Sequence, residues 1–367
     1  MLSNDVATMA RIRKDHSLLL YLAFILILLA IAILLQYYLK MAEVPTGDIG
    51  IDFSAIPLNK SEVRFFGWVT TSQKSIESFI KNAAHFAWVS PTGSEVDSNG
   101  NFLGKVDPGV IETAKRSNVG VVPLVANANF DRDLMHRILT DEVISDRTIS
   151  SIVKFIVEGN FTGVNIDWEN IPPEDRQSLN SYMRDLADRL HAHGKLVTID
   201  VSGKTSDETT GWGGAWDYKA LGQITDYVCI MVYDYHWSGG TAGPIGPLSW
   251  LEQVIQYALL SIPKDKIVIG IPFYGYDWIG TKGEGVIFDQ AVSNAKTAGV
   301  KITFSEKDGE YTYSYRAPDG RHEVWFQGAL STEMRISTAL RFGIDRIAAW
   351  SVGQEDPRTW EVIDRKL

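Results

Sequence analysis

The chain has 367 residues, of which 45% are hydrophobic and 22% are charged, with 31 glycines and 13 prolines. This composition is ordinary for a globular protein. The net charge of −10 makes nucleic acid and anionic lipid surfaces poor partners. Cys229 is the only cysteine, which excludes a disulfide bond within the chain.

The N-terminal region contains an apolar run that is long enough to cross a membrane. Eighteen apolar residues follow one another from Leu18 to Leu35, whereas the core of a cleavable signal peptide has about 7 to 15 residues and a span about 20. Three basic residues precede the run and only Lys40 follows it closely, which predicts a cytoplasmic N-terminus. We therefore expect a single-pass protein of the cell membrane, with a cytoplasmic tail (1–16), a transmembrane anchor (17–39) and a linker (40–60). A cleaved signal peptide is the alternative.

The remainder, 61–367, alternates short apolar runs with helix-like segments, of which 146–159 and 175–194 are the clearest. Eight alternating strands over about 300 residues predict a (β/α)8 TIM barrel. A doubly wound open sheet is the alternative, which is disfavoured because no glycine-rich phosphate turn follows a strand. The expected strands are 63–69, 85–91, 119–127, 163–170, 195–203, 227–235, 266–276 and 346–353.

Two segments depart from this alternation. Asn99-Gly100 lies between short strand-like segments, which predicts a hairpin after strand two. Two Asp-Gly turns separate aromatic and β-branched runs further along the chain, which predicts a small α+β insertion, 279–328, between strands seven and eight. We expect this insertion to form one wall of a substrate groove through its aromatic residues Tyr311, Tyr313, Tyr315 and Trp325.

The octapeptide "GVNIDWEN" (163–170) places polar residues at every second position. On a barrel strand, Asn165, Asp167 and Glu169 therefore face the lumen, and Glu169 lies at the carboxyl end, where barrel active sites form. Burying two carboxyl groups together raises the pKa of one of them, and a carboxyl group that is protonated near neutral pH is a general acid. An ordinary strand with one face in solvent is the plainer interpretation. In a closed barrel, however, one face of each strand meets the helices and the other meets the lumen, so the polar face would not be exposed to solvent.

Polar and aromatic residues also stand at other strand ends. A ring of tyrosines and tryptophans around buried carboxyl groups suits a sugar, whose C–H faces stack on aromatic rings; packing in the core is the plainer role for any single one. These further candidates are Trp68, Tyr233, Asp234, Trp237, Tyr274, Tyr276 and Trp350.

The sequence resembles family 18 glycoside hydrolases, in particular the branch with spore-cortex-lytic enzymes and with hydrolase modules fused to polysaccharide deacetylases and glycosyltransferases. The resemblance covers about residues 62–367. The last Asp and the Glu of the family's strand-four signature fall on Asp167 and Glu169, its second Asp on Asn165 and its first on Thr162. The strand-six Met-x-Tyr-Asp motif falls on 231–234 and the strand-eight tryptophan on 350. The chitinase Ser-x-Gly-Gly motif is replaced by "PLVANAN".

The resemblance implies a glycosidase that cleaves β-1,4 linkages of N-acetylglucosamine-containing glycans with retention and substrate assistance. Glu169 then protonates the leaving oxygen, and Asp167 holds the acetamido N–H. Tyr233 would hydrogen-bond the acetamido oxygen, and Trp350 would form the floor of the pocket. Asn165, in place of a carboxylate, removes one charge from the buried row, so we expect an altered pH profile.

Other interpretations remain open at this stage. A membrane-anchored barrel that binds glycans without turnover is the main alternative, and a scaffold that uses the barrel only as a fold is another. We expect no cofactor and a monomer. We also expect no metal, because His191 and His193 are spaced two apart and the other histidines are scattered. The expected partner is an N-acetylated polysaccharide: peptidoglycan, chitin oligomers or an exopolysaccharide, cleaved in endo or exo fashion.

Overall fold

The computed structural model describes residues 63–97 and 99–366, all within the compact unit Leu58–Leu367. The expected cytoplasmic tail, anchor and linker lie outside these residues, so the anchor stays a prediction. Within the described residues, no helix combines the length and the apolar character that crossing a membrane requires.

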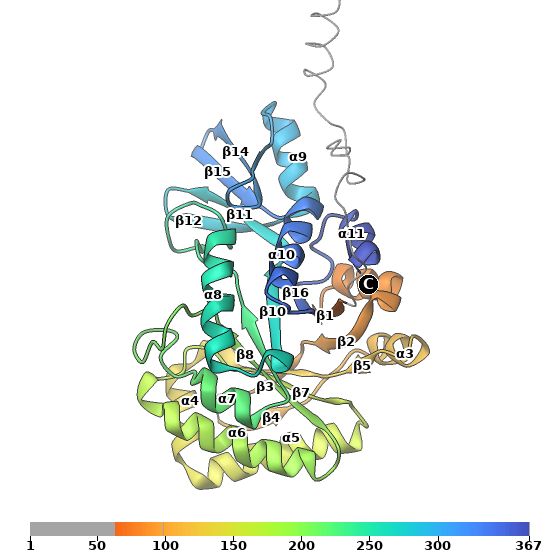
Figure 1. Cartoon of the computed structure of the whole chain (residues 1–367), viewed down its shortest axis with the longest axis vertical. Coiled ribbons are helices and arrows are strands. Elements are labelled where there is room, and N and C mark those ends of the chain that lie inside the picture. The colour runs from red at the N-terminus through yellow and green to blue at the C-terminus, as the bar shows by residue number, and fades with distance from the viewer. Residues whose placement is uncertain (1–62, 98, 367) are drawn as a thin grey trace, which may run out of the picture. The chain divides into compact units, whose positions relative to one another are not determined.

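The main sheet of Figure 1 follows the predicted alternation of strands and helices. Neighbouring barrel strands are parallel, and the order runs β6-β7-β8-β9-β10-β16-β1-β2-β5. Since β5 leads into β6 after two residues, the pairing returns to its starting segment, as in a TIM-barrel-like fold. Its strands are β1 (Arg64–Val69), β2 (Phe86–Pro91), β5 (Gly120–Val121), β6 (Leu124–Asn127), β7 (Gly163–Asp167), β8 (Leu196–Ser202), β9 (Tyr227–Met231), β10 (Ile267–Pro272) and β16 (Arg346–Trp350).

Alternation along the strands divides the interior into two apolar clusters. Val164 and Ile166 of β7 belong to the large cluster that the helices cover, together with Trp168. A smaller cluster includes Phe66, Trp68, Trp88, Leu124 and Cys229 from alternate positions of other strands. This period of two confirms that Asn165 and Asp167 face the inside of the barrel.

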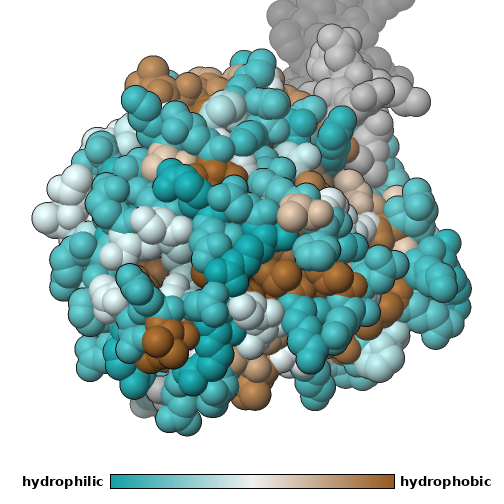
Figure 2. Space-filling view, turned by 90° about the horizontal axis from the view of Figure 1, so that it is seen from below, coloured by the Kyte–Doolittle hydropathy of each residue, from teal (hydrophilic) through white to brown (hydrophobic). Residues whose placement is uncertain are grey.

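Several helices begin at aspartates, whose carboxylates accept hydrogen bonds from the first turn. Asp107, Asp131, Asp141 and Asp217 all cap helices in this way. The face shown in Figure 2 is mostly hydrophilic, with hydrophobic side chains in a few patches. The helices are α2 (Gln73–Asn82), α3 (Pro108–Arg116), α4 (Arg132–Thr140), α5 (Glu142–Glu158), α6 (Arg176–His191), α7 (Tyr218–Ile224), α8 (Leu248–Ser261), α9 (Phe288–Ala298), α10 (Ala329–Arg341) and α11 (Thr359–Lys366).

Replacing one of these caps gives a stability prediction. The Asp141 carboxylate accepts from the backbone N–H groups of Val143 and Ile144 at 2.9 and 3.1 Å. Asp141→Ala removes the carboxylate that accepts from these two donors, so we expect the free energy of unfolding to fall by about 1 kcal/mol. The control Asp133→Ala, which removes no cap, should change it by less than about 0.5 kcal/mol. Denaturant titration measures both, and equal effects would contradict the capping account.

The insertion is a second, five-stranded sheet with α9, at the top of Figure 1. It starts earlier than expected, because barrel strand seven ends at Pro272 and Tyr274 already pairs within the second sheet. The prediction that strand seven extends through Tyr276 is therefore wrong. The strands, in the order β12-β11-β15-β14-β13, are β11 (Tyr274–Ile279), β12 (Lys282–Ile287), β13 (Thr303–Ser305), β14 (Glu310–Ala317) and β15 (Gly320–Phe326).

A buried ion pair ties this second sheet to the segment after β9. Glu310 accepts hydrogen bonds from the backbone N–H groups of Ile245 and Gly246, and from Arg335 of α10 at 2.6 Å. Both charged side chains are almost fully buried, and such a pair is tolerated because its hydrogen bonds are satisfied. The pair fixes the insertion beside the carboxyl ends of the barrel strands.

The predicted hairpin after strand two is confirmed. Its strands, β3 (Ser94–Val96) and β4 (Phe102–Leu103), pair antiparallel. In addition, β3 pairs in parallel with β6. It therefore continues the line of β2, the second barrel strand, beside β6, which belongs to the third. The hairpin thereby reaches the rim at which β6 ends.

Candidate active site

One cavity of about 810 Å³ opens at the carboxyl ends of the barrel strands. Residues from β6, β7, β8, β9, β16 and the insertion line it, although they are far apart in sequence. Its size is typical of a site for a small molecule or a short oligomer. It brings together most of the predicted site residues: Asp167, Glu169, Tyr233, Asp234, Tyr274, Tyr276 and Trp350.

Glu169, just beyond the end of β7, is held by a side chain that the sequence analysis missed. Asn127, the last residue of β6, exchanges two hydrogen bonds with the Glu169 backbone, at 2.9 Å from the N–H and 3.0 Å to the carbonyl oxygen. Asn127 is almost fully buried and lines the same cavity. The backbone from which the Glu169 carboxyl group projects is therefore fixed on both sides.

The two carboxyl groups of the octapeptide hold protons at unusually high pH. Burial raises the pKa of Asp167 to about 7. Burial, and then the charges of Asp167 and Asp234, raise the pKa of Glu169 to about 8. Glu169 is therefore protonated at neutral pH, as a general acid must be. Among the described residues, Asp167 Oδ1 is buried without a hydrogen-bond partner, so it can accept from a ligand.

A third carboxyl group, Asp200 of β8, was also missed. The register that pairs Ile166 with Ile199 brings it next to Asp167. Burial, followed by the charge of Asp167, raises the pKa of Asp200 well above its ordinary range. Asp200 adds a carboxyl group to the buried row from the neighbouring strand, and the altered pH profile expected from Asn165 stays a prediction.

Asn165 and Trp68 support this row from below. Both are 2% exposed and neither lines the large cavity, so the prediction that they contact a substrate is wrong. The Asn165 amide donates to Asp200 Oδ2 at 2.7 Å, and the Trp68 indole donates to the same oxygen at 3.1 Å. The Trp68 ring also packs edge-on against Trp350, with 6.0 Å between centroids. Asn165 and Trp68 lie further from the carboxyl ends of their strands than the residues that line the cavity. They therefore orient Asp200 and Trp350 instead of reaching the rim.

Tyrosines and Asp234 form the opposite side of the cavity. Tyr274 and Tyr276 donate to Asp234 Oδ1 at 2.5 and 3.0 Å. Asp234 has a φ of 60°, in the left-handed region that few residues other than glycine adopt. Burial raises the pKa of Tyr233 well above its ordinary range, so its phenol keeps a proton to donate.

The insertion supplies a wall of this cavity, but not with the expected residues. Tyr276 of β11 and Gly285, Val286 and Ile287 of β12 line it. The expected Tyr311 and Tyr313 of β14 are buried at 2% and 4% exposure inside the insertion. The edge that faces the barrel is therefore the β11–β12 hairpin.

Trp237 lies apart from the other predicted residues. It is 55% exposed and lines a second cavity, of about 570 Å³. Four residues line both cavities: Glu169, Met231, Tyr233 and Asp234. Glu169 therefore stands where the two cavities meet.

This arrangement can perform acid–base chemistry on a polar ligand whose C–H faces stack on aromatic rings. It offers a protonated carboxyl group, a deeper carboxyl group with a free acceptor oxygen, and a phenol donor. Within residues 63–97 and 99–366, no group of three or more His, Cys, Asp or Glu side chains is placed to hold a metal ion.

Comparisons with known proteins agree with this geometry. The family described as glycosyl hydrolases family 18 matches residues 66–355. The cortical fragment-lytic enzyme of Bacillus anthracis is 29% identical over 326 residues, 84% of this chain and 72% of that protein. The enzyme of the same name from Bacillus subtilis is 30% identical over 259 residues, 68% of this chain. The match spans only 60% of the Bacillus subtilis protein.

Solved structures show the same fold. The spore cortex-lytic enzyme SleL of Bacillus cereus superposes with a TM-score of 0.79 at 26% identity, covering 85% of this chain and 76% of that one. A chitinase from Chromobacterium violaceum has a TM-score of 0.78 at 25% identity, covering 83% and 98%. The family match, the barrel and the carboxyl groups on β7 together lead to one conclusion: the chain belongs to family 18 of the glycosyl hydrolases.

Proposed function

We propose that this protein cleaves β-1,4 linkages of glycans that contain N-acetylglucosamine, by a retaining and substrate-assisted mechanism. The observation that carries the proposal is the pair at the end of β7. Glu169 has a pKa of about 8, and Asp167 beside it has a buried acceptor oxygen that lacks a hydrogen-bond partner among the described residues. This pair can deliver a proton to a leaving group and receive an N–H group of the sugar.

In the first step, the acetamido carbonyl oxygen of the substrate attacks the anomeric carbon while the glycosidic C–O bond breaks. The leaving oxygen takes the proton of Glu169, and an oxazolinium ion remains. In the second step, the Glu169 carboxylate accepts a proton from water while the water oxygen bonds to the anomeric carbon. The bond between this carbon and the acetamido oxygen breaks, which opens the oxazolinium ring. Two inversions give net retention, and the regenerated acid closes the cycle.

Asp167 and Tyr233 act on the acetamido group in this scheme. The Asp167 carboxylate accepts the acetamido N–H and balances the positive charge of the oxazolinium ion. Tyr233 keeps its phenol proton and donates it in a hydrogen bond to the acetamido oxygen. Trp350 lines the same cavity and offers an aromatic face beneath the sugar ring.

The names of the relatives guide the choice of substrate. Cortical fragment-lytic enzymes and chitinases are among the similar proteins, and both names point to N-acetylated polysaccharides. We therefore propose peptidoglycan and chitin oligomers as the substrate classes. Incubating the full-length protein in mild detergent with each glycan and sizing the products by mass spectrometry tests this. We expect fragments that end in N-acetylated sugars; intact polymers in every case would refute the activity.

Asn127 gives a prediction about this acid. Asn127→Ala removes both hydrogen bonds to the Glu169 backbone, so the carboxyl group loses its fixed position. Displacing a catalytic group by about 1 Å costs on the order of 10²-fold in rate. We therefore expect kcat on a soluble oligosaccharide to fall by about 10- to 100-fold with little change in KM.

The control for this prediction is Asn82→Ala. Asn82 is also buried and bonds to a backbone carbonyl, that of Ser78 in α2, but it does not line the large cavity. It should keep the wild-type kcat. Equal losses in the two variants would mean that Asn127 supports folding only.

We also propose that the apolar run from Leu18 to Leu35 anchors the barrel on the outer face of the cell membrane. The run and its basic flank support this orientation. Protease added to intact cells should release the barrel as a fragment that begins near the linker. Complete protection of the barrel until the cells are permeabilised would refute the orientation, and release without protease would indicate a cleaved signal peptide.

A further inference from the structure

Asp200 of β8 is a carboxyl group in the large cavity that the proposed mechanism does not use. It lines the cavity although it is only 2% exposed. Its two oxygens have different surroundings. Oδ2 accepts hydrogen bonds from the Asn165 amide and the Trp68 indole, whereas Oδ1 is buried without a hydrogen-bond partner among the described residues. Such an oxygen is costly to bury unless it carries a proton that it can donate.

The groups that face Asp200 bring no positive charge to it. The strand register places Asp167 of β7 on one side of it and Cys229 of β9 on the other. Burial, and then the charge of Asp200, raise the pKa values of the Cys229 thiol and of the Tyr233 phenol, so both groups are neutral. No Lys, Arg or His in the described part of the chain lines the large cavity or the second one.

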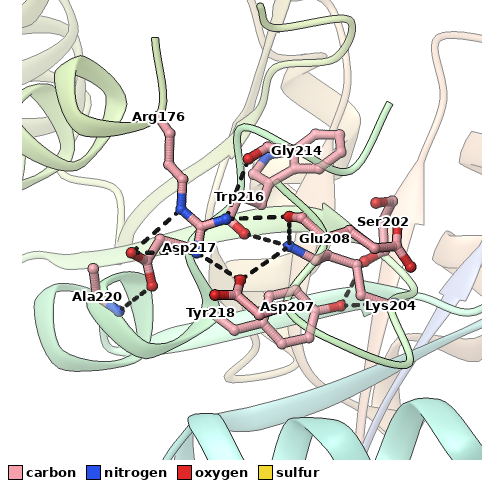
Figure 3. A network of polar contacts seen from close by, with 10 residues as sticks. All are labelled: Arg176, Ser202, Lys204, Asp207, Glu208, Gly214, Trp216, Asp217, Tyr218 and Ala220. Atoms are coloured by element: carbon pink, nitrogen blue, oxygen red, sulfur yellow. Dashed lines mark hydrogen bonds and ion pairs between the residues drawn. The ribbon is translucent and has the colours of Figure 1, made fainter. Parts of the chain in front are cut away.

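The cation nearest to Asp200 along the chain has its partners elsewhere. Lys204 stands just beyond the end of β8, and Figure 3 shows its ammonium group among groups of the following loop. It donates to the backbone carbonyls of Glu208 and Trp216 at 2.9 and 2.8 Å. Its ion pair is with Asp207, at 3.9 Å. Lys204 therefore serves the loop and does not neutralise Asp200.

Asp217, in the network of Figure 3, shows how this fold holds an ionised aspartate. It accepts from the Arg176 guanidinium at 3.4 Å and from the Ala220 N–H at 3.0 Å. Partial burial opposes its charge, but these two contacts outweigh burial and lower the pKa of Asp217. Asp200 has no such cation. Burial, followed by the charge of Asp167, raises the pKa of Asp200, and the hydrogen bonds to Oδ2 offset only part of this effect.

We propose that Asp200 works as a neutral carboxylic acid whose proton, on Oδ1, forms a hydrogen bond to the Asp167 carboxylate. Two adjacent buried carboxyl groups hold one proton between them, because the charge on one makes ionisation of the other costly. A carboxyl group that stays protonated at neutral pH can act as a hydrogen-bond donor. Asp200 is then a positioning residue, which keeps Asp167 ionised and in place for the acetamido N–H. The inference rests on the proposed function, in which Asp167 must carry a charge.

Two substitutions separate a neutral donor from an anion. Asp200→Asn keeps an N–H group that can donate to Asp167 and an oxygen that can accept from Asn165. Asp200→Leu has a similar size but no donor. Losing a hydrogen bond to a charged group costs about 10- to 100-fold, so we expect Asp200→Leu to lower kcat by about that range and Asp200→Asn by less than about tenfold.

The pH profile of kcat gives a second readout, which a purely structural role would not move. Asp200→Leu should shift the acidic limb to higher pH, because the ionised Asp167 loses its donor. Asp200→Asn should keep this limb close to that of the wild type. If Asp200 carried a charge, removing that charge would instead shift the acidic limb to lower pH in both variants.

Infrared difference spectroscopy measures the protonation of Asp200 without turnover. The background is Glu169→Gln, in which the acid itself contributes no carboxyl band. At a pH above the Asp167 pKa of about 7, adding Asp200→Asn should remove one C=O band of a protonated carboxyl group. Asp217→Asn in the same background is the control, because Asp217 is ionised and lines neither cavity. It should leave the band unchanged.

Separate outcomes identify what fails. A protonated carboxyl band that survives Asp200→Asn, or an acidic limb that moves to lower pH in Asp200→Asn, would overturn the proposal. The infrared measurement needs no glycan and no Leu variant, so it decides the matter even if Asp200→Leu does not fold. A wild type that cleaves no N-acetylated glycan would instead refute the proposed function.

Discussion

Glu169→Gln is expected to lower kcat about 10²- to 10⁴-fold, which corresponds to roughly 3 to 5 kcal/mol of barrier. The amide keeps the shape of the side chain and leaves the Asn127 hydrogen bonds to the backbone intact, but it cannot donate a proton to the leaving oxygen. Oligosaccharide affinity, measured by calorimetry, should change little. A substrate with an activated aryl leaving group needs little protonation, so it should partly restore the rate.

Glu112→Gln serves as the control, since Glu112 is an exposed residue of α3 whose ion pair within the described part of the chain is with Arg116 of the same helix. Its kcat should equal that of the wild type. A Glu169→Gln variant with wild-type turnover would show that another group supplies the proton. Wild-type protein that binds glycans but cleaves them no faster than Glu169→Gln would favour the binding protein over the enzyme.

Asp167→Asn is expected to lower kcat about 10²- to 10³-fold, because the charge that balances the oxazolinium ion is lost. An activated leaving group should not restore this rate, since protonation is not what the variant lacks. The contrast between the two variants separates the acid from the electrostatic partner.

Asp167→Asn should also change the pH profile of kcat in a defined direction. In the wild type, activity requires an ionised Asp167, with a pKa of about 7, and a protonated Glu169, with a pKa of about 8. The rate should therefore fall both below pH 7 and above pH 8. The charge of Asp167 is one cause of the raised pKa of Glu169, so Asp167→Asn should move the alkaline limb to lower pH. An alkaline limb that stays in place would contradict this coupling.

The architecture and most of the site could be predicted from the sequence because a period of two along strands fixes which face a residue takes. Val164 and Ile166 pack under the helices and Asp167 faces the lumen, as "GVNIDWEN" indicates. The carboxyl ends of parallel strands meet at one rim, so Tyr233 and Trp350 could be assigned to the same cavity.

Depth along the strand and register between strands could not be predicted in this way. Trp68 and Asn165 have the correct face but lie below the cavity floor. Asp200 reaches Asp167 only through the register of β7 and β8. The signal for it was an aspartate at a lumen-facing position of the apolar run "LVTIDVS".

Contacts between loops and strand ends were the other gap. Asn127 stands one residue beyond the last position at which β6 pairs with β7, and it acts through the backbone of Glu169. Lys204 bonds to carbonyls that follow it by four and twelve residues. Neither contact follows a regular spacing in the sequence, because each depends on the conformation of an irregular segment beyond the end of a strand.

The most direct test of the mechanism compares two oligosaccharides that differ only in their acetyl groups. We expect the protein to cleave the fully N-acetylated oligomer and to release, as the first product, the β-anomer at the new reducing end, observed by NMR before mutarotation. The fully de-acetylated oligomer should remain intact, because it lacks the carbonyl oxygen that attacks the anomeric carbon. Cleavage of both oligomers at equal rates, or release of the α-anomer, would contradict the substrate-assisted mechanism.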